Sequence, residues 1–572
     1  MRSLYLSTVD QDYRQDYDSV LGPWSFASVE NDYPNWQDMS FLNAFDSAAA
    51  VSQASQECAD LTGYMVAQWA NKLNALNGVD YKTKFWSPLI TRWVFHSTSA
   101  AWRRWNLVKQ FIEKNREKSF KVSIITPAIQ KKWQFTGLAE FIDLGLLSPE
   151  YDLWLYSLII ERLAPSDWVI EKADTSKLCS TKQFLPQQLP VSTNIAKRLG
   201  RRLLGRLPFS DIPGVNPAWT IVFSTFLQII PKKTKTKYYF FDFPNPPLNV
   251  PVEFLDMLDI ILENTVLQSV TKRFYENNKR AQKHKYVAGR LFINAASHSN
   301  EEANFQAAHA INAGEAFTRA QHGASYGTMA HSHVKKLTEY TMSAFLTWGW
   351  KSQNNLQGKF VALPSPLLSK IRNRHRPLNA NIILVGTKTW LRSQRIDYTP
   401  DPSYTPLYRK EKIKFISALD PEIMKNFYYR PYLRSQGELA DKEYVLKYFP
   451  MLKTIDGSLE RPMLGCRVLV LDHPGTTLNM SMAANVPTIC FWNDNTWPLS
   501  PEATPYFDNL RRVGILFSEG TSAATKINEN FNDLQSWWNS PEVQSARKAW
   551  ADHYAHSSKI WWWYWFRELW RL

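Results

Sequence analysis

The sequence is poor in cysteine. Its 572 residues include only four cysteines, and these lie far apart and form no Cys-x-x-Cys pair. Disulfide frameworks and structural zinc sites need clustered cysteines, so the sequence argues against both and fits a reducing cytosol. Glycine and proline are not in excess. With 44% hydrophobic and 21% charged residues, the composition is typical of a globular chain rather than a disordered one.

Long hydrophobic runs are also lacking. No stretch of about 18 apolar residues occurs, which predicts that the chain has no transmembrane helix. The first residues, MRSLYLSTVDQDYRQDYDS, become acidic where the apolar core of a signal peptide would lie. We therefore expect a cytoplasmic protein.

Positive charge is plentiful: the formal net charge is +15. Such an excess predicts an anionic partner, which can be nucleic acid, anionic lipid or a phosphorylated substrate. The sequence has no zinc-finger spacing, no RNP-like aromatic strand and no compact basic helix, and its basic clusters are short and scattered. We therefore expect no nucleic-acid partner. A non-catalytic protein that binds nucleic acid or polysaccharide stays open as an alternative based on the charge alone.

Strand-like and helix-like segments alternate along the chain. Strands are expected at 4–8, 120–125, 238–242, 286–296, 380–386, 414–418, 466–471 and 486–492, and helices at 40–120, 137–147, 254–278 and 478–485. This alternation predicts an α/β fold with parallel sheets, and the length predicts two or more domains. We expect a helix-rich N-terminal domain at 1–348, a second doubly wound domain at 349–540 and an aromatic C-terminal helix at 541–572.

The turn DHPGTT, residues 472–477, lies between a predicted strand and a predicted helix. Ligands bind at the carboxyl ends of parallel strands, and a helix that begins there offers free N–H groups to an anion. Gly475 would let the backbone approach a phosphate, and Thr476 and Thr477 would add hydroxyl donors. The equally weighted alternative is that one of these threonines only caps the helix.

Basic residues follow two other predicted strand ends. Lys388 comes directly after the strand at 380–386, and Arg392 and Arg395 follow it. Arg430 precedes Pro431 in the segment FYYRPYL. A phosphate bound between two domains favours such cations, although each basic residue taken alone is more often a surface residue.

The segment RAQHGASYGT, residues 319–328, places a histidine between Gln321 and Gly323, with a second glycine, Gly327, four residues on. The glycines predict a tight loop at a strand end that faces the domain junction. A neutral His322 there could accept a proton from a sugar hydroxyl. Glu339 could orient this histidine or act as the base itself. A buried histidine that is hydrogen-bonded to backbone is the alternative.

Together, RAQHGASYG, Glu339, FLTWGW at Phe345–Trp350 and TTLNMSMAANVPTICFW at Thr476–Trp492 resemble a family of transferases from bacterial surface-polysaccharide clusters. The resemblance covers about residues 285–500. That family is similar to capsule Kdo transferases, to pseudaminic-acid and other nonulosonate transferases, and more distantly to glycerophosphate polymerases. His473-Pro474 also resembles the His-Pro motif with which bacterial sialyltransferases contact the CMP phosphate.

The resemblance implies a GT-B glycosyltransferase, in which two Rossmann-like domains face a cleft. It implies a CMP-activated donor of an acidic sugar and a glycan or lipid-linked glycan acceptor. A CDP-polyol phosphotransferase is the alternative. His322 and Glu339 would be catalytic, and the donor would be bound by Lys388, Arg430, His473, Gly475, Thr476, Thr477 and Asn479. Many relatives have an acidic residue near Asn479 for a ribose hydroxyl, so this departure bears on which nucleotide is bound.

No cofactor is expected, and by the same resemblance catalysis would be independent of metal. Asp10-Gln-Asp12 has the Asp-x-Asp form that binds Mg²⁺ or Mn²⁺ in some transferases, but its acidic surroundings indicate a solvated loop. The C-terminal segment SSKIWWWYWFRELWRL is apolar nearly all round as a helix. It would either pack back on the first domain, which we favour, or lie on the inner membrane, where Trp and Tyr rings are stable.

Overall fold

The computed structural model describes most of the chain. The described residues are 1–27, 29, 32–130, 132–174, 204, 207–232, 236–240, 249–295, 300–351, 356–387, 391–432 and 441–572. Within these ranges, no helix is both long enough and apolar enough to cross a membrane. The predicted donor-binding residue Lys388 lies outside the described residues.

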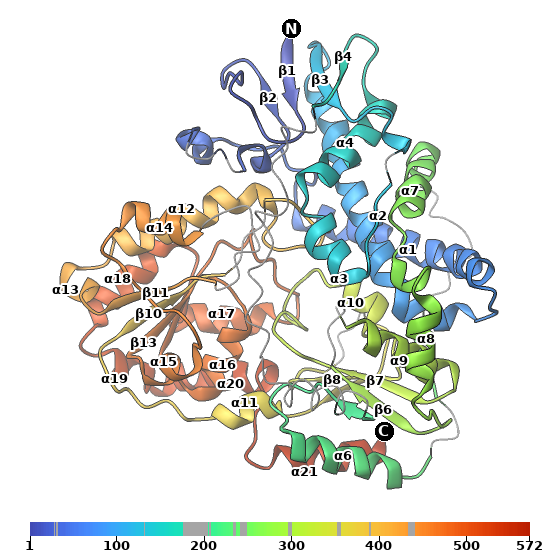
Figure 1. The fold of residues 1–572 in the computed structure, drawn as a ribbon. Coiled ribbons are helices and arrows are strands. Elements are labelled where there is room, and N and C mark those ends of the chain that lie inside the picture. Colours follow the sequence, from blue (N-terminus) through green and yellow to red (C-terminus); the bar gives the residue numbers. More distant parts are fainter. Residues whose placement is uncertain are drawn as a thin grey trace.

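Three parallel sheets organise the fold (Figure 1). The first has the order β2-β1-β3-β4, with β1 at Arg2–Tyr5, β2 at Ser19–Val20, β3 at Phe120–Ile124 and β4 at Val169–Lys172. The second has the order β5-β6-β7-β8-β9, with β5 at Phe209–Ser210, β6 at Leu291–Asn294, β7 at Ala316–Ala320, β8 at Ala344–Thr347 and β9 at Phe360–Ala362. The predicted boundary at residue 348 falls between β8 and β9, which pair with each other, so this sheet continues to Ala362.

The third sheet is doubly wound. Its order is β12-β11-β10-β13-β14-β15, with β10 at Ile382–Val385, β11 at Phe427–Arg430, β12 at Lys453–Thr454, β13 at Val468–Leu471, β14 at Thr488–Phe491 and β15 at Leu516–Phe517. Counted from β10, this is the Rossmann order 3-2-1-4-5-6, in which the direction of winding reverses between β10 and β13. Ligands of such sheets bind beside that reversal, where the segment after β13 begins at Asp472.

Helices cover the sheets and fill the N-terminal part. In chain order they are α1 Ala48–Asn77, α2 Thr83–Lys114, α3 Leu138–Glu140, α4 Pro149–Leu163, α6 Pro217–Ile229, α7 Val252–Thr265, α8 Phe274–Gln282, α9 Glu301–Asn312, α10 His333–Thr338, α11 Pro366–Ile371, α12 Thr405–Ser417, α13 Pro421–Met424, α14 Asp441–Tyr448, α15 Glu460–Gly465, α16 Thr476–Ala484, α17 Thr504–Arg512, α18 Gly520–Asn530, α19 Leu534–Trp538, α20 Pro541–Tyr554 and α21 Trp561–Arg571. The predicted α/β class, with parallel sheets and a helix-rich N-terminal part, is confirmed.

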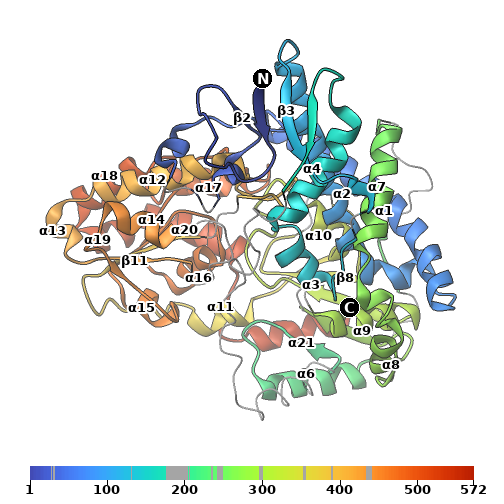
Figure 2. The same cartoon turned by 45° about the horizontal axis from the view of Figure 1, so that its top comes forward.

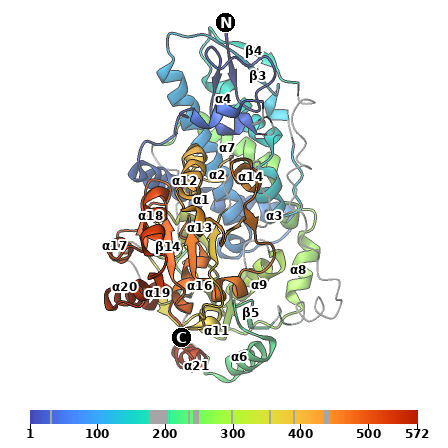
Figure 3. The ribbon, with the colours of Figure 1, turned by 90° about the vertical axis from the view of Figure 1, so that its left-hand side faces the viewer.

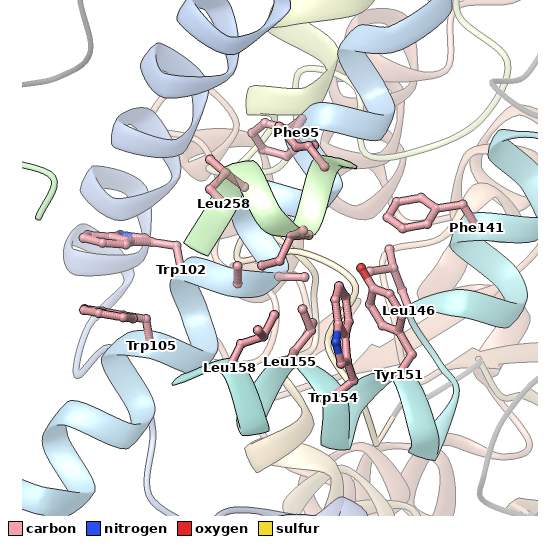
Figure 4. Packing of buried hydrophobic residues seen from close by; sticks show 14 of the residues in the cluster. Phe95, Trp102, Trp105, Phe141, Leu146, Tyr151, Trp154, Leu155, Leu158 and Leu258 are labelled. Carbon is pink, nitrogen blue, oxygen red and sulfur yellow. The ribbon is translucent and has the colours of Figure 1, made fainter. Parts of the chain in front are cut away.

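The largest core lies where α2, α4 and α7 meet (Figure 4). Trp102 and Trp105 of α2 both contact the ring of Phe254 on α7, and Trp154 of α4 is fully buried. Fully burying large aromatic and aliphatic side chains stabilises a fold by roughly 1.5–3 kcal/mol each. This core makes α2 a rigid support, and α2 runs from beside the first sheet toward the second (Figure 2).

The segment after β10 is anchored in the N-terminal part. Asp152 on α4 accepts hydrogen bonds from Arg104 Nε at 2.6 Å and from Arg392 Nε at 3.1 Å, and all three side chains are buried. Arg395 pairs with the buried Asp397 at 2.6 Å. Arg392, which the sequence offered as a donor cation, therefore joins the two halves of the chain, whereas Arg395, offered in the same role, pairs within its own segment.

The C-terminal helices divide between the two halves. Trp550 on α20 lies in the core of the third sheet with Met482 of α16. Helix α21 instead packs against α6 beside the second sheet, where Trp565 and Leu569 are buried with Phe209 (Figure 3). Two facing parallel α/β units with a last helix that returns to the first make the arrangement GT-B-like.

Three predicted elements differ from the structure. Residues 414–418 were expected as a strand but lie in and at the end of α12, because a short apolar run has no period that separates a buried strand from a helix. The described part of 238–242 is not a strand; Tyr238 packs instead beside the second sheet. The helix expected at 254–278 is broken into α7 and α8 by a 3-10 turn at Gln268–Val270.

Candidate active site

The Gln-His-Gly loop begins where β7 ends at Ala320. The side-chain oxygen of Gln321 accepts hydrogen bonds from Trp348 N and from Trp350 Nε1, both at 2.9 Å, and its amide nitrogen donates to Gly323 O at 2.9 Å. The glutamine therefore fastens the loop to the Trp-Gly-Trp segment after β8. This bonding links the two motifs in space.

Each glycine of the loop lies against a neighbour. At Gly323 a Cβ atom would lie 3.3 Å from Thr476 Oγ1, so this position allows close approach to the third sheet. Gly327 has φ +72, and a Cβ there would lie 2.7 Å from Trp350 Cδ2. The expectation of a tight, glycine-dependent loop is confirmed at both positions.

His322 belongs to a chain of hydrogen bonds. The Tyr326 hydroxyl lies 3.0 Å from His322 Nδ1 and donates to Glu339 Oε2 at 2.7 Å. Arg92 of α2 donates to Glu339 Oε1 at 2.5 Å. Because the tyrosine has one hydrogen and gives it to the carboxylate, its oxygen accepts from His322 Nδ1–H. Nε2 of His322 then carries the free electron pair.

The charges of this chain are set by burial and by neighbours. His322 is open to solvent on one side, but the protein that encloses it on the others lowers its pKa, against the opposing effect of Glu339. Burial alone would raise the pKa of Glu339, but Arg92, His322 and the Tyr326 hydrogen bond outweigh it and lower that pKa. Near neutral pH this chain of hydrogen bonds therefore contains a neutral His322 imidazole and an ionised Glu339 carboxylate.

Lys335 of α10 supports the same loop. Its ammonium donates to Ser325 O at 3.0 Å and to Ser325 Oγ at 3.1 Å, and it lies 4.0 Å from the centre of the Tyr326 ring. Burial lowers the pKa of Lys335 to about 8. Its charge helps to keep the histidine neutral.

The other half of the site is the start of α16. Gly475 is the N-cap residue and no side chain caps the helix, so Thr476 and Thr477 occupy the first turn without a capping role. Both threonines are half-buried. The first N–H groups of a helix have no partner within it, and its dipole favours an anion there. A helix start of this kind suits an anion such as a phosphate.

A buried polar cluster lies behind this helix start. His473 Nδ1 donates to Asp472 Oδ1 at 2.8 Å, and the other oxygen, Oδ2, accepts from the Tyr408 hydroxyl at 2.7 Å and lies 3.4 Å from Lys412 Nζ. Lys412 is fully buried and also pairs with Asp441 at 2.5 Å. The aspartate thus fixes which nitrogen of His473 carries hydrogen and how the ring is oriented.

The two halves are directly bonded to each other. The backbone N–H of Ala324 donates to Thr476 Oγ1 at 3.1 Å. Ser500 N donates to Thr328 O at 2.9 Å, and Met329 forms an antiparallel bridge with Leu499. The structure therefore brings the predicted residues His322, Glu339, His473, Gly475, Thr476 and Thr477 to one junction.

Two predicted donor residues are engaged elsewhere. Asn479 is buried and its amide nitrogen donates to Tyr554 O at 2.7 Å, so this side chain ties α16 to α20. Arg430 ends β11, two strands away from β13, and donates to the carbonyl oxygens of Pro431 at 2.5 Å and Gly457 at 2.6 Å.

Metal ligands are not gathered among the described residues, which contain no group of three His, Cys, Asp or Glu side chains fit to hold an ion. Asp10 of the Asp-x-Asp segment lies in the connection between β1 and β2, where it accepts from the Tyr5 hydroxyl at 2.9 Å and from Asp12 N at 3.0 Å.

Sequence reasoning missed several members of the site, among them Arg92, Tyr326, Tyr408 and Lys412. Tyr326 stands inside the motif that drew attention to His322, so its position four residues later was an available signal. Arg92 lies 247 residues from Glu339 along the chain, and only the fold brings them together.

A family model described as LIC12162 family transferase matches residues 2–569, which is nearly the whole chain. The chain belongs to the LIC12162 family of transferases. No curated protein matches its sequence. Among solved structures it is similar to MurG of Acinetobacter baumannii, with 10% identity over 53% of this chain and 78% of that chain and a TM-score of 0.29. A structural similarity with that score is too low to support a fold assignment, which rests instead on the strand order given above.

Proposed function

We propose that this transferase is a glycosyltransferase. It moves an acidic sugar, a nonulosonate such as pseudaminic acid or Kdo, from a CMP-activated donor to a capsule or O-antigen glycan. The observation that carries the proposal is the contact between the His322 loop and the first turn of α16. It sets a neutral imidazole beside a place suited to a phosphate.

The donor phosphate is assigned to the first turn of α16. The N–H groups there and the Thr477 hydroxyl would hold the CMP phosphate, and His473 would add a further donor once its Nε2 is also protonated. These groups stabilise the negative charge that grows on the phosphate as the bond to the sugar breaks. CMP as the nucleotide is supported by the resemblance of His473-Pro474 to the sialyltransferase motif.

The acceptor hydroxyl is assigned to His322. Nε2 takes the proton of that hydroxyl while its oxygen forms the new bond to the anomeric carbon. The bond between that carbon and the phosphate oxygen breaks, and its electron pair leaves with CMP. Glu339 acts through Tyr326, because both of its oxygens are already hydrogen-bonded, so it serves to position the histidine and not as the base.

Donor nucleotides, acceptor glycans and product masses test the function. The protein should be stabilised thermally by CMP, and incubation with a CMP-sugar and an acceptor should yield a glycan heavier by one sugar residue. Stabilisation by oligonucleotides alone would favour the non-catalytic alternative. A product that contains a new phosphodiester, seen by phosphorus NMR, would favour the CDP-polyol phosphotransferase.

A further inference from the structure

Helices α6 and α21 form a pair at one edge of the molecule, where Figures 1 and 3 show them side by side. Aromatic rings join them: Trp219 stacks on Trp562 with ring centres 6.0 Å apart, and Phe223 lies 4.5 Å from Phe566. The inner faces of both helices are buried against the second sheet through Trp565 and other residues. Their outer faces are directed away from that sheet.

The outer faces are apolar and exposed. On α6 the exposed fractions are 53% for Ile221, 45% for Val222 and 71% for Ile229. On α21 they are 54% for Trp563 and 53% for Trp570. At helical spacing, Val222 and Ile229 share one face of α6, and Trp563 and Trp570 share one face of α21. We call the exposed residues of these two faces the α6–α21 surface.

The exposed charges nearest to this surface are positive. Helix α6 contains no acidic residue, and the exposed charged residues of α21 and of the flanks are Lys232, Lys559, Arg567 and Arg571. Glu568 is the single acidic residue of α21. It is only 20% exposed and pairs with both Arg567 and Arg571. Exposed tryptophan and isoleucine with a basic rim match the boundary layer of an anionic bilayer.

We propose that the α6–α21 surface docks on an anionic membrane. Trp563, Trp570 and Ile229 enter the headgroup boundary, and the basic residues contact the lipid phosphates. The docking is peripheral, because neither helix is long and apolar enough to span a bilayer. This proposal does not depend on the identity of the donor, and it leaves the reaction at the junction unchanged.

Charge argues against a second copy of the chain as the occupant. A two-fold interface would place the same surface of both molecules together. It would therefore bring Arg567 and Arg571 of one copy toward the same cations of the other. Anionic lipid instead neutralises them, with a gain of about fivefold in affinity for each cation near the bilayer.

The test is cosedimentation of the full-length protein with vesicles. We expect binding to phosphatidylcholine mixed with phosphatidylglycerol, weak binding to phosphatidylcholine alone, and loss of binding as salt is added. The double variant Trp563→Ser/Trp570→Ser should bind the mixed vesicles about tenfold less or worse. Arg567→Gln/Arg571→Gln should lose about fivefold per charge.

The matched control removes equally exposed apolar groups from other faces. Tyr275 and Met451 are 76% and 92% exposed, and Tyr275→Ser/Met451→Ser should bind vesicles like the unmodified protein. Melting temperatures show whether each variant is folded. The proposal is wrong if the folded tryptophan variant binds the mixed vesicles as well as the control does. It is also wrong if the unmodified protein does not bind the mixed vesicles; a tryptophan variant that then abolishes self-association, measured by sedimentation velocity, would point to a second copy of the chain instead.

Discussion

Thr476 Oγ1 accepts a hydrogen bond from the backbone N–H of Ala324 at 3.1 Å, which joins the loop after β7 to the first turn of α16. The bond puts the loop that carries His322 against the Asp472–Thr477 turn after β13. Taken alone, His322 could be a structural histidine, and Thr476 or Thr477 could only cap a helix. The contact between loop and turn, with the helix left uncapped by any side chain, is what favours catalysis at this junction.

His322→Ala should reduce turnover by roughly a hundredfold or more, because a positioned general base supplies that factor. CMP binding should change little, since the phosphate is assigned to α16. His284→Ala, two residues beyond the end of α8, is the matched control. A His322→Ala protein that keeps full turnover at an unchanged melting temperature would end the role of this histidine as base.

Tyr326→Phe should keep the ring and lose the hydroxyl that connects His322 to Glu339. We expect turnover to fall by about 10-fold to 100-fold, as is usual when a group that orients a functional side chain is removed. The Michaelis constant for the donor should stay nearly constant. The control is Tyr340→Phe, a neighbouring buried tyrosine that is not hydrogen-bonded to His322. Equal losses in both variants would reduce Tyr326 to a packing role.

Thr477→Val should weaken CMP binding, by about 1–3 kcal/mol for a hydrogen bond to a charged group. Thr476→Val should weaken it too and should also lower the melting temperature, because Ala324 N–H loses its partner. Thr521 is the second residue of α18, as Thr477 is of α16, and α18 follows β15, which lies three strands away from β10. Thr521→Val should change neither CMP binding nor the melting temperature. Calorimetry with CMP checks all three, and identical dissociation constants would remove α16 as the phosphate site.

The dependence of kcat/KM on pH should report His322. Its pKa is lowered, so the neutral base persists as pH falls below 6.5, and activity should decline only at lower pH. The charge of Glu339 raises the pKa of His322, so Glu339→Gln should lower that pKa further and move the acidic limb to lower pH. An acidic limb that moves upward, or one that stays in place, would contradict the electrostatic link.

The sequence predicted what depends on local pattern. The apolar strand before the turn at 472–477 was visible, and so were the glycines at 323 and 327 that the close contacts require. The strand before Gln321 was not among the predicted strands. The predicted donor role of Asn479 gains no support from the structure, because its amide nitrogen donates to the carbonyl oxygen of Tyr554. Tyr554 lies 75 residues away along the chain, so local sequence could not indicate this bond. Partners such as Arg92 and Lys412 were invisible because helices far along the chain supply them.

One measurement tests the central claim most directly. Purified protein is incubated with a CMP-activated nonulosonate and a glycan acceptor, and CMP release and product mass are followed for the unmodified chain and for His322→Ala. The account predicts release of CMP that depends on the acceptor, a product heavier by one sugar residue, and release at least about a hundredfold slower in the variant. No CMP-dependent transfer with any nonulosonate or Kdo donor, or equal rates for both proteins, would contradict it.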